Sequence, residues 1–353
     1  MFILGFKSYV AITMDSLILS QIRKKDLIEI FEKNYHKISP LWSNHQLEWI
    51  NGVYGAYKDH DKYIIVIHLI KKTFDFYTKN FVKETFVEFF EKEFIEIEAF
   101  NVIEVSRALN IPKESARRKI IELEKSGAIK RVGKRIIIDK SAFAFIKPEK
   151  SIIRISRFLS TISTILYNEK VITNQFDSTQ IKGFIENNFS LIWKLYYEVQ
   201  IPMLLNWKKV FKDIETFHIW AVCVVNQKLN SQREKNDKMI KKVFIKKYFF
   251  NHDDVEDGIN AMSISDISGI PRATVIRKLN TLIKQNYLNI NNNKLYYLAA
   301  KHEKELTLRQ KINFNNLSEF IKRIFNLMLV EQKQLKKRNE KLPYGAQKYL
   351  NPL

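Results

Sequence analysis

The sequence predicts a mainly α-helical protein that contains two winged helix-turn-helix units, each preceded by a helical region. Three observations support this fold class. The stretch at residues 101–139 recurs at residues 260–298. Each copy has the order helix, tight turn, helix, β-hairpin, as read from its apolar periodicity and turn residues. Only 9 Gly and 7 Pro occur among 353 residues, which favours helices over an all-β fold.

The two copies align without a gap when Pro112 is set over Pro271, an offset of 159 residues. Polar as well as apolar positions are shared, so the match is more than a common hydrophobic pattern. The identical pairs place Ser106, Ile111, Pro112, Arg118, Lys119, Leu123 and Lys125 over Ser265, Ile270, Pro271, Arg277, Lys278, Leu282 and Lys284.

Residues 1–97 form the first predicted helical region. Apolar residues at i and i+4 spacing predict helices over residues 16–35 and 63–77. Regularly spaced phenylalanines predict an amphipathic helix over residues 82–100 that leads into the first winged unit.

Residues 98–147 form the first predicted winged unit. A short helix over residues 103–109 is capped by Asn101 and ends at Asn110, a residue that enters the left-handed region readily. A second helix follows Pro112, and Gly127 ends it. Strands over residues 128–132 and 135–139 flank a turn at Gly133, which predicts the wing.

Residues 148–255 form a second helical region with a basic linker. Helices are predicted over residues 152–167, 181–197 and 208–225, with Pro202 as a break, and a basic run covers residues 228–247. Lys58, Asp59 and Tyr63 match Lys212, Asp213 and Phe217 at an offset of 154. This weak match suggests that each helical region was duplicated together with its winged unit.

Residues 256–303 form the second predicted winged unit, and residues 304–353 a C-terminal helix and basic tail. A helix over residues 263–268, capped by Ser263, ends at Gly269. The recognition helix follows Pro271, and strands over residues 287–290 and 294–298 flank an Asn-rich turn. An amphipathic helix over residues 317–334 would suit homodimerisation.

The second copy resembles the helix-turn-helix of IclR- and MarR-type bacterial regulators. The resemblance lies in Pro271-Arg-Ala-Thr-Val-Ile-Arg277, a Pro-x-x-Thr-Val-x-Arg recognition helix behind a flexible turn. The first copy departs from it, with Ser115 and Ala116 in place of Thr-Val and with Glu114 inside the recognition helix. The resemblance implies a winged fold and a DNA-binding role for these two stretches only.

The net charge of +21 predicts a polyanionic partner, nucleic acid first and an anionic membrane surface second. Heavy use of Lys, Ile and Asn offers a compositional explanation of the same charge. One cysteine, Cys223, excludes an internal disulfide, and no apolar stretch reaches the roughly 18 residues of a membrane span. With no signal-peptide pattern at the start, we expect a cytoplasmic protein.

The predicted DNA contacts come from the recognition helices and the wings. Arginines on these helices can bond guanine edges or phosphates, and lysines would neutralise phosphates. The alternative for Arg118 and Arg277 is a salt bridge to Glu104 or Asp266. The candidate residues are Lys113, Ser115, Arg117, Arg118, Lys119, Lys130, Arg131, Lys134, Arg135, Arg272, Thr274, Arg277, Lys278, Asn292 and Lys294.

Three functions fit these features. The first is a sequence-specific transcriptional regulator of double-stranded DNA, reading two adjacent half-sites. The second is a plasmid- or phage-type replication initiator with tandem winged helices. The third is a structural module whose winged helices bind protein. No phosphate-binding loop, nucleophile motif or metal-ligand spacing is present, so we expect neither enzymatic activity nor a cofactor.

Overall fold

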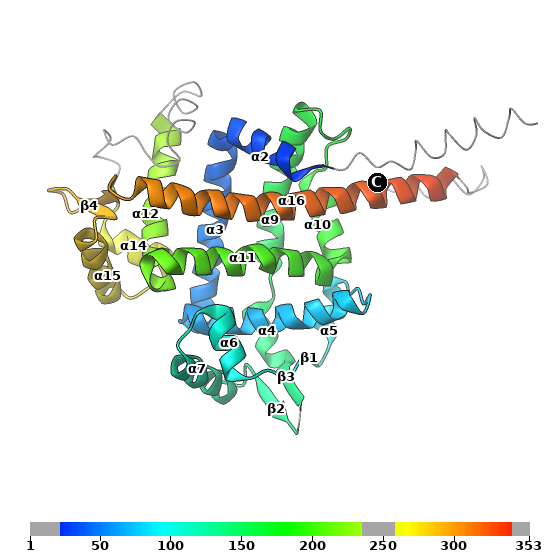
Figure 1. The fold of residues 1–353 in the computed structure, drawn as a ribbon, viewed down its shortest axis with the longest axis horizontal. Coiled ribbons are helices and arrows are strands. Elements are labelled where there is room, and N and C mark those ends of the chain that lie inside the picture. Colours follow the sequence, from blue (N-terminus) through cyan, green and yellow to red (C-terminus); the bar gives the residue numbers. More distant parts are fainter. Residues whose placement is uncertain (1–21, 134, 235–257, 341–353) are drawn as a thin grey trace, which may run out of the picture.

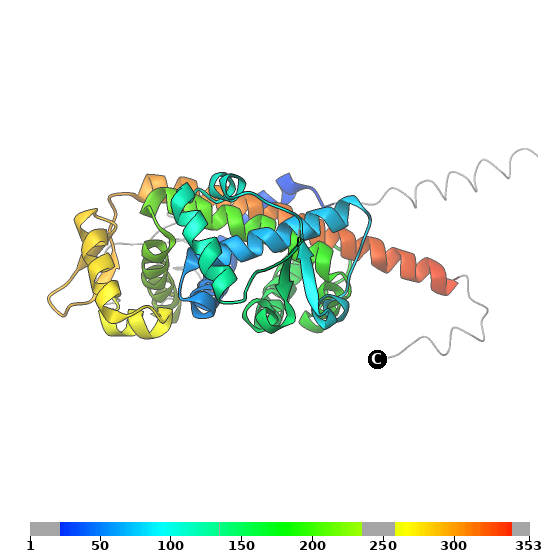
Figure 2. The same cartoon turned by 90° about the horizontal axis from the view of Figure 1, so that it is seen from below.

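The computed structural model describes residues 22–133, 135–234 and 258–340. It is mainly helical, and two small winged units lie at the edge of a helical scaffold (Figure 1). The scaffold helices form two crossed layers, which Figure 2 shows from below. One layer contains α4 (His60–Lys79), α11 (Phe189–Phe211) and α16 (Glu303–Glu340); the other contains α3 (Tyr35–Tyr57), α9 (Glu149–Asn168), α10 (Ser178–Asn187) and α12 (Ile214–Glu234).

The first winged unit contains a strand that the sequence pattern missed. Residues 82–100 are not one helix, because α5 (Phe86–Glu91) is followed by strand β1 (Phe94–Ile97). The unit continues with α6 (Val102–Leu109), α7 (Lys113–Lys125), β2 (Lys130–Val132) and β3 (Arg135–Asp139). Its antiparallel sheet has the order β1-β3-β2, with Ile95 opposite Ile138 and Arg131 opposite Ile136. The unit therefore begins at Phe94, before the predicted boundary at residue 98.

The second winged unit repeats this plan with a shorter sheet. It contains α14 (Ala261–Ser268), α15 (Arg272–Lys284), β4 (Leu288–Ile290) and β5 (Tyr296–Leu298). A bridge between Ile259 and Tyr296 takes the place of β1. Asn260, and not the predicted Ser263, caps α14, because its side chain accepts a hydrogen bond from the Ser263 amide. Asn260 is the counterpart of the cap Asn101 at the same offset of 159 residues.

The scaffold helices confirm the suspected duplication of the helical regions. Shifting α2 (Lys24–Lys33) and α3 by 154 residues gives the bounds of α10 and α11. The junctions match as well: the Asn34 amide donates to Ile30 O at 3.0 Å, and the Asn188 amide donates to Phe184 O at 2.9 Å. Both copies end this helix in a positive-φ residue, Lys58 and Lys212.

The two halves pack reciprocally. Helix α4 of the first half contacts α11 of the second, and its counterpart α12 contacts α3. Likewise α16 contacts α2, and its counterpart α9 contacts α10. Reciprocal contacts of this kind define a two-fold relationship, as in an isologous dimer. The chain is thus an internal pseudo-dimer, and the pseudo-two-fold exchanges the two crossed layers.

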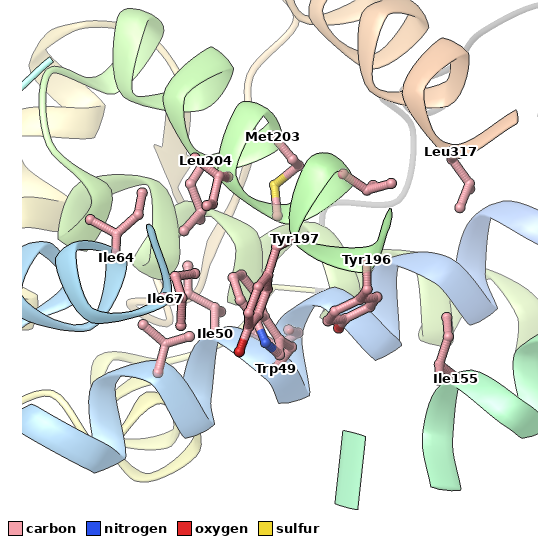
Figure 3. Packing of buried hydrophobic residues seen from close by; sticks show 14 of the residues in the cluster. Trp49, Ile50, Ile64, Ile67, Ile155, Tyr196, Tyr197, Met203, Leu204 and Leu317 are labelled. Carbon is pink, nitrogen blue, oxygen red and sulfur yellow. The ribbon is translucent and has the colours of Figure 1, made fainter. Parts of the chain in front are cut away.

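The core lies between the layers and is rich in aromatic residues. Figure 3 shows Trp49 of α3 beside Tyr196 and Tyr197 of α11. The Trp49 and Tyr196 ring centroids are 6.4 Å apart in an edge-to-face arrangement. Cys223 is fully buried, and burial raises the pKa of its thiol to about 12, which fits an inert core residue.

Several predicted helix boundaries were wrong. The predicted helix over residues 181–197 is divided between α10 and α11, and the one over residues 208–225 between α11 and α12. Pro202 lies inside α11 instead of breaking it. Its exposed position explains this tolerance, because the carbonyl that loses its amide partner stays near solvent.

The C-terminal helix α16 uses its apolar stripe within the chain. Leu317, Phe320 and Phe325 are buried, and α16 packs on α2 and α11. This stripe therefore does not provide the dimer surface that the sequence suggested. Most of the basic run at residues 228–247 and the tail beyond residue 340 lie outside the described residues.

Candidate nucleic-acid interface

Each recognition helix, α7 and α15, is fixed against its partner helix by the same turn. Asn110 and Gly269 adopt the left-handed conformation, with φ of 49° and 69°. A serine of the preceding helix closes each turn: Ser106 Oγ donates to Ile111 O, and Ser265 Oγ donates to Ile270 O, both at 2.7 Å. The buried faces carry the predicted apolar residues, Ala116, Ile120 and Leu123 in α7 and Val275, Leu279 and Leu282 in α15.

Lys119 and Lys278 face the scaffold, which corrects the expectation that they contact DNA phosphates. Lys119 forms an ion pair with Asp59, the N-cap residue of α4. Lys278 Nζ lies 2.7 Å from Oδ2 of Asp213, just before α12. Both lysine side chains are only 12% exposed. Because Asp59 and Asp213 are counterparts in the duplication, both recognition helices are fastened to the scaffold in the same way.

The neighbouring arginines face outward. Arg118 is 69% exposed, and its Nε is 3.8 Å from Glu122 Oε1 on its own helix. Arg277 is exposed and forms no salt bridge with any residue that the structure describes. The alternative reading of Arg118 is wrong, because Glu104 accepts a hydrogen bond from Lys72 at 2.7 Å instead.

Most of the other predicted contact residues share this open surface. Ser115 and Thr274 are half-buried near the starts of the two recognition helices. Lys134 lies outside the described residues. The remaining exposed candidates are Lys113, Arg117, Lys130, Arg131, Arg135, Arg272, Asn292 and Lys294.

The wings differ in how freely they present charge. In the first wing each described cation has a carboxylate nearby: Lys130 Nζ is 3.0 Å from Asp139, Arg131 Nε 2.6 Å from Glu124 and Arg135 Nε 3.8 Å from Glu96. These three side chains remain 44%, 53% and 66% exposed, so a phosphate can still compete for them. In the second wing Asn291 Oδ1 accepts the amides of Asn293 and Leu295 and shapes the turn. That leaves Asn292 and Lys294 exposed at its tip.

The two recognition helices approach one another at a buried histidine pair. His60 Nε2 is 3.0 Å from His218 Nδ1, and His218 Nε2 is 2.6 Å from Asn51 Oδ1. Burial lowers the pKa of His60 to about 3, and the charges of Lys119 and Lys278 add to the shift. Since one imidazole senses a lysine from each recognition helix, both helices meet the scaffold close to the junction of α4 and α12.

Sequence reasoning missed Asp59 and Asp213 as the anchors of the recognition helices. The signal was present, because both aspartates belong to the weak match at an offset of 154. What the sequence lacked was a reason to connect that match with Lys119 and Lys278, which lie 60 and 65 residues further along the chain.

The described part of the chain offers no competing chemistry of the usual kinds. Within it, no group of three or more His, Cys, Asp or Glu side chains could hold a metal ion. None of the helices in that part is long and apolar enough to cross a bilayer. No protein-family model, curated protein or solved structure matches this chain.

Proposed function

We propose that this chain is a sequence-specific double-stranded DNA-binding protein that acts as a transcriptional regulator. Each recognition helix, α7 and α15, enters a major groove, which is wide enough to admit a helix. One observation carries the proposal. In each unit a lysine turned inward fixes the helix to the scaffold, while the preceding arginine, Arg118 or Arg277, is turned outward.

The exposed residues divide naturally between two tasks. Arg118 and Arg277 are the candidates for base reading, because an arginine can bond both acceptors of a guanine edge. Lys113 and Arg272, at the starts of the recognition helices, and the wing cations are suited to phosphates, which fix register and dominate affinity. The net charge of +21 supplies the long-range attraction that both tasks need.

The pseudo-two-fold predicts the arrangement of the DNA site. Two-fold related recognition helices read half-sites that run in opposite directions on the duplex. The half-sites should differ in sequence, because Arg117 of α7 corresponds to Ile276 of α15 and Ser115 corresponds to Thr274. One chain would therefore read an imperfect inverted repeat.

The test is selection of bound duplexes from a random pool, followed by fluorescence anisotropy on the selected site at several salt concentrations. Arg118→Ala and Arg277→Ala should each weaken binding by about 1–3 kcal/mol at the selected sequence. Arg157→Ala is the matched control, because Arg157 is an exposed arginine on scaffold helix α9. Retention of DNA that is insensitive to salt and unchanged in both recognition-helix variants would reject the proposal in favour of a protein-interaction module.

A plasmid- or phage-type replication initiator is the second candidate. It is favoured by the presence of both recognition helices in one chain, so that a single copy can complete a site. Single copies can then line up on an array of repeated sites without first forming dimers. If a circular DNA carrying the selected sites replicates only when the chain is supplied, the initiator role holds over the regulator role.

A further inference from the structure

A cavity of about 670 Å³ lies between α3, α11 and the connector that follows the first wing. Its volume is within the range of small-molecule sites. The connector contains a 3₁₀ turn (Lys140–Ala142) and α8 (Phe143–Ile146) and runs to the start of α9 at Glu149. The second half has only residues 299–302 between β5 and α16. The cavity wall is thus an addition to one half that the duplicated fold does not require.

Aromatic side chains of the core form one side of the cavity. Trp49, Tyr63, Trp193 and Tyr197 line it, and Figure 3 shows Trp49 and Tyr197 side by side. Each of these residues is largely buried, and their rings are held by one another: the Trp49 and Tyr63 centroids are 6.2 Å apart. Flat rings fixed in this way favour a planar aromatic ligand.

The opposite side is cationic and centres on Arg154 of α9. Its side chain is 22% exposed, and Nη2 donates to Ser151 Oγ at 3.2 Å. Nε lies 3.3 Å from Glu48 Oε2, but the angle is unfavourable, and this buried Nε forms no hydrogen bond within the described residues. The guanidinium therefore retains a donor for an acidic ligand.

The start of α9 adds a second group of donors to the same wall. Its N-cap, Pro148, provides no side-chain cap, and the first intrahelical bond runs from Ile152 N to Pro148 O. The amides of residues 149–151, which line the cavity, thus have no acceptor within the helix. Lys147 and Lys150 also line it, and with Arg154 they outnumber Glu48 and Glu149. The helix dipole and the side chains together favour an anion.

We propose that this cavity binds a small aromatic carboxylate. The ring lies against Trp49 and Tyr197, and the carboxylate accepts hydrogen bonds from Arg154 and from the first amides of α9. The site does not depend on the proposed DNA binding. Its connector continues directly from β3 of the first wing, so the ligand would occupy the joint between the scaffold and the first winged unit.

The first experiment compares naphthoate with naphthamide, which has the same ring and no charge, by quenching of tryptophan fluorescence in the full chain. Naphthoate should bind saturably, and naphthamide at least about tenfold more weakly. Arg154→Met should weaken naphthoate binding by a similar factor. Arg157→Met, one turn further along α9 and outside the cavity, should leave it unchanged.

A second variant keeps the proposal testable if Arg154→Met disturbs folding. Gly52 of α3 lines the cavity, and a Cβ built there meets nothing within 4 Å, so Gly52→Leu should fill the space without strain and abolish binding. Gly55→Leu is the matched control on the same helix, also into open space but away from the cavity. Equal binding of the two probes, no saturable binding of naphthoate, or full binding by Gly52→Leu would each overturn the proposal.

Discussion

Lys278 Nζ donates a 2.7 Å hydrogen bond to Asp213 Oδ2, across the joint between recognition helix α15 and scaffold helix α12. Burial alone would raise the pKa of Asp213, but hydrogen bonds from Lys278 and Thr216 outweigh it and hold that pKa below its usual value. Lys119 makes the same joint with Asp59 in the other half. The two ion pairs are therefore structural joints, and the outward arginines depend on them for their orientation.

The first prediction separates a joint from a phosphate contact. Lys278→Met should destabilise the protein by about 1–3 kcal/mol, because it leaves a partly buried carboxylate without its donor. Urea denaturation measures this loss, and adding Asp213→Asn should recover part of it. The slope of log affinity against log salt should stay unchanged in the variant. A slope that falls by about 0.9 would instead mark Lys278 as a phosphate contact.

A second prediction concerns pH. Burial lowers the pKa of His60 to about 3 and holds that of His218 well below its usual value. An unfolded chain binds these protons near pH 6.5, so between pH 6.5 and about 3 it holds more protons than the folded chain. Stability should therefore fall as pH drops through this window, by about 1 kcal/mol per pH unit for each histidine.

Urea denaturation at pH 7 and pH 5 measures this dependence, and His60→Gln should reduce it. Lys119 and Lys278 face the pair from the recognition helices, and Tyr54 and Asn51 face it from α3. None of these four groups gains or loses a proton near pH 6, so the pH slope belongs to the histidines. A stability that does not change between pH 7 and pH 5 would contradict the burial of the pair.

The sequence predicted the parts of the fold that local signals specify. The turn residues Asn110 and Gly269 and the strand at residues 135–139 were placed correctly, and the two recognition helices begin directly after the predicted Pro112 and Pro271. Turn chemistry and helix periodicity act over a few residues, so a single sequence contains enough information for them.

Non-local structure was harder to predict. Strand β1 was mistaken for helix because Phe94 and Ile97 continue the helical spacing of Phe86 and Phe90, while its partner β3 lies some 40 residues away. Periodicity also shows that Lys119 is on the polar side of its helix, but it cannot say whether that side meets DNA or Asp59. The reciprocal packing of the halves required the coordinates, although the offset of 154 pointed to it.

A third prediction tests the turn that positions the recognition helices. Gly269 has φ of 69°, and a Cβ there meets nothing within 4 Å, so Gly269→Ala introduces backbone strain without a clash. It should cost about 1–2 kcal/mol in thermal or urea unfolding. Asn110→Gly is the control in the other half, where φ is 49°, and it should cost nothing. An Ala variant as stable as the parent would mean that the turn relaxes out of the left-handed region.

The last prediction follows from the pseudo-two-fold and concerns DNA. One chain should protect a single site with two inverted, non-identical half-sites on one face of the duplex, as seen by hydroxyl-radical footprinting. Arg118→Ala should weaken protection and base preference in one half-site, and Arg277→Ala should do so in the other, because each arginine belongs to a different unit.

Base-interference mapping with both variants assigns each half-site to its unit. Two half-sites in the same direction would contradict a two-fold arrangement on DNA, since the scaffold contacts of α4 with α11 and of α3 with α12 hold the units in inverted orientation. Loss of both half-sites in either single variant would show that the units bind as one cooperative surface, and the ion pairs of Lys119 and Lys278 beside His60 provide the physical link for it.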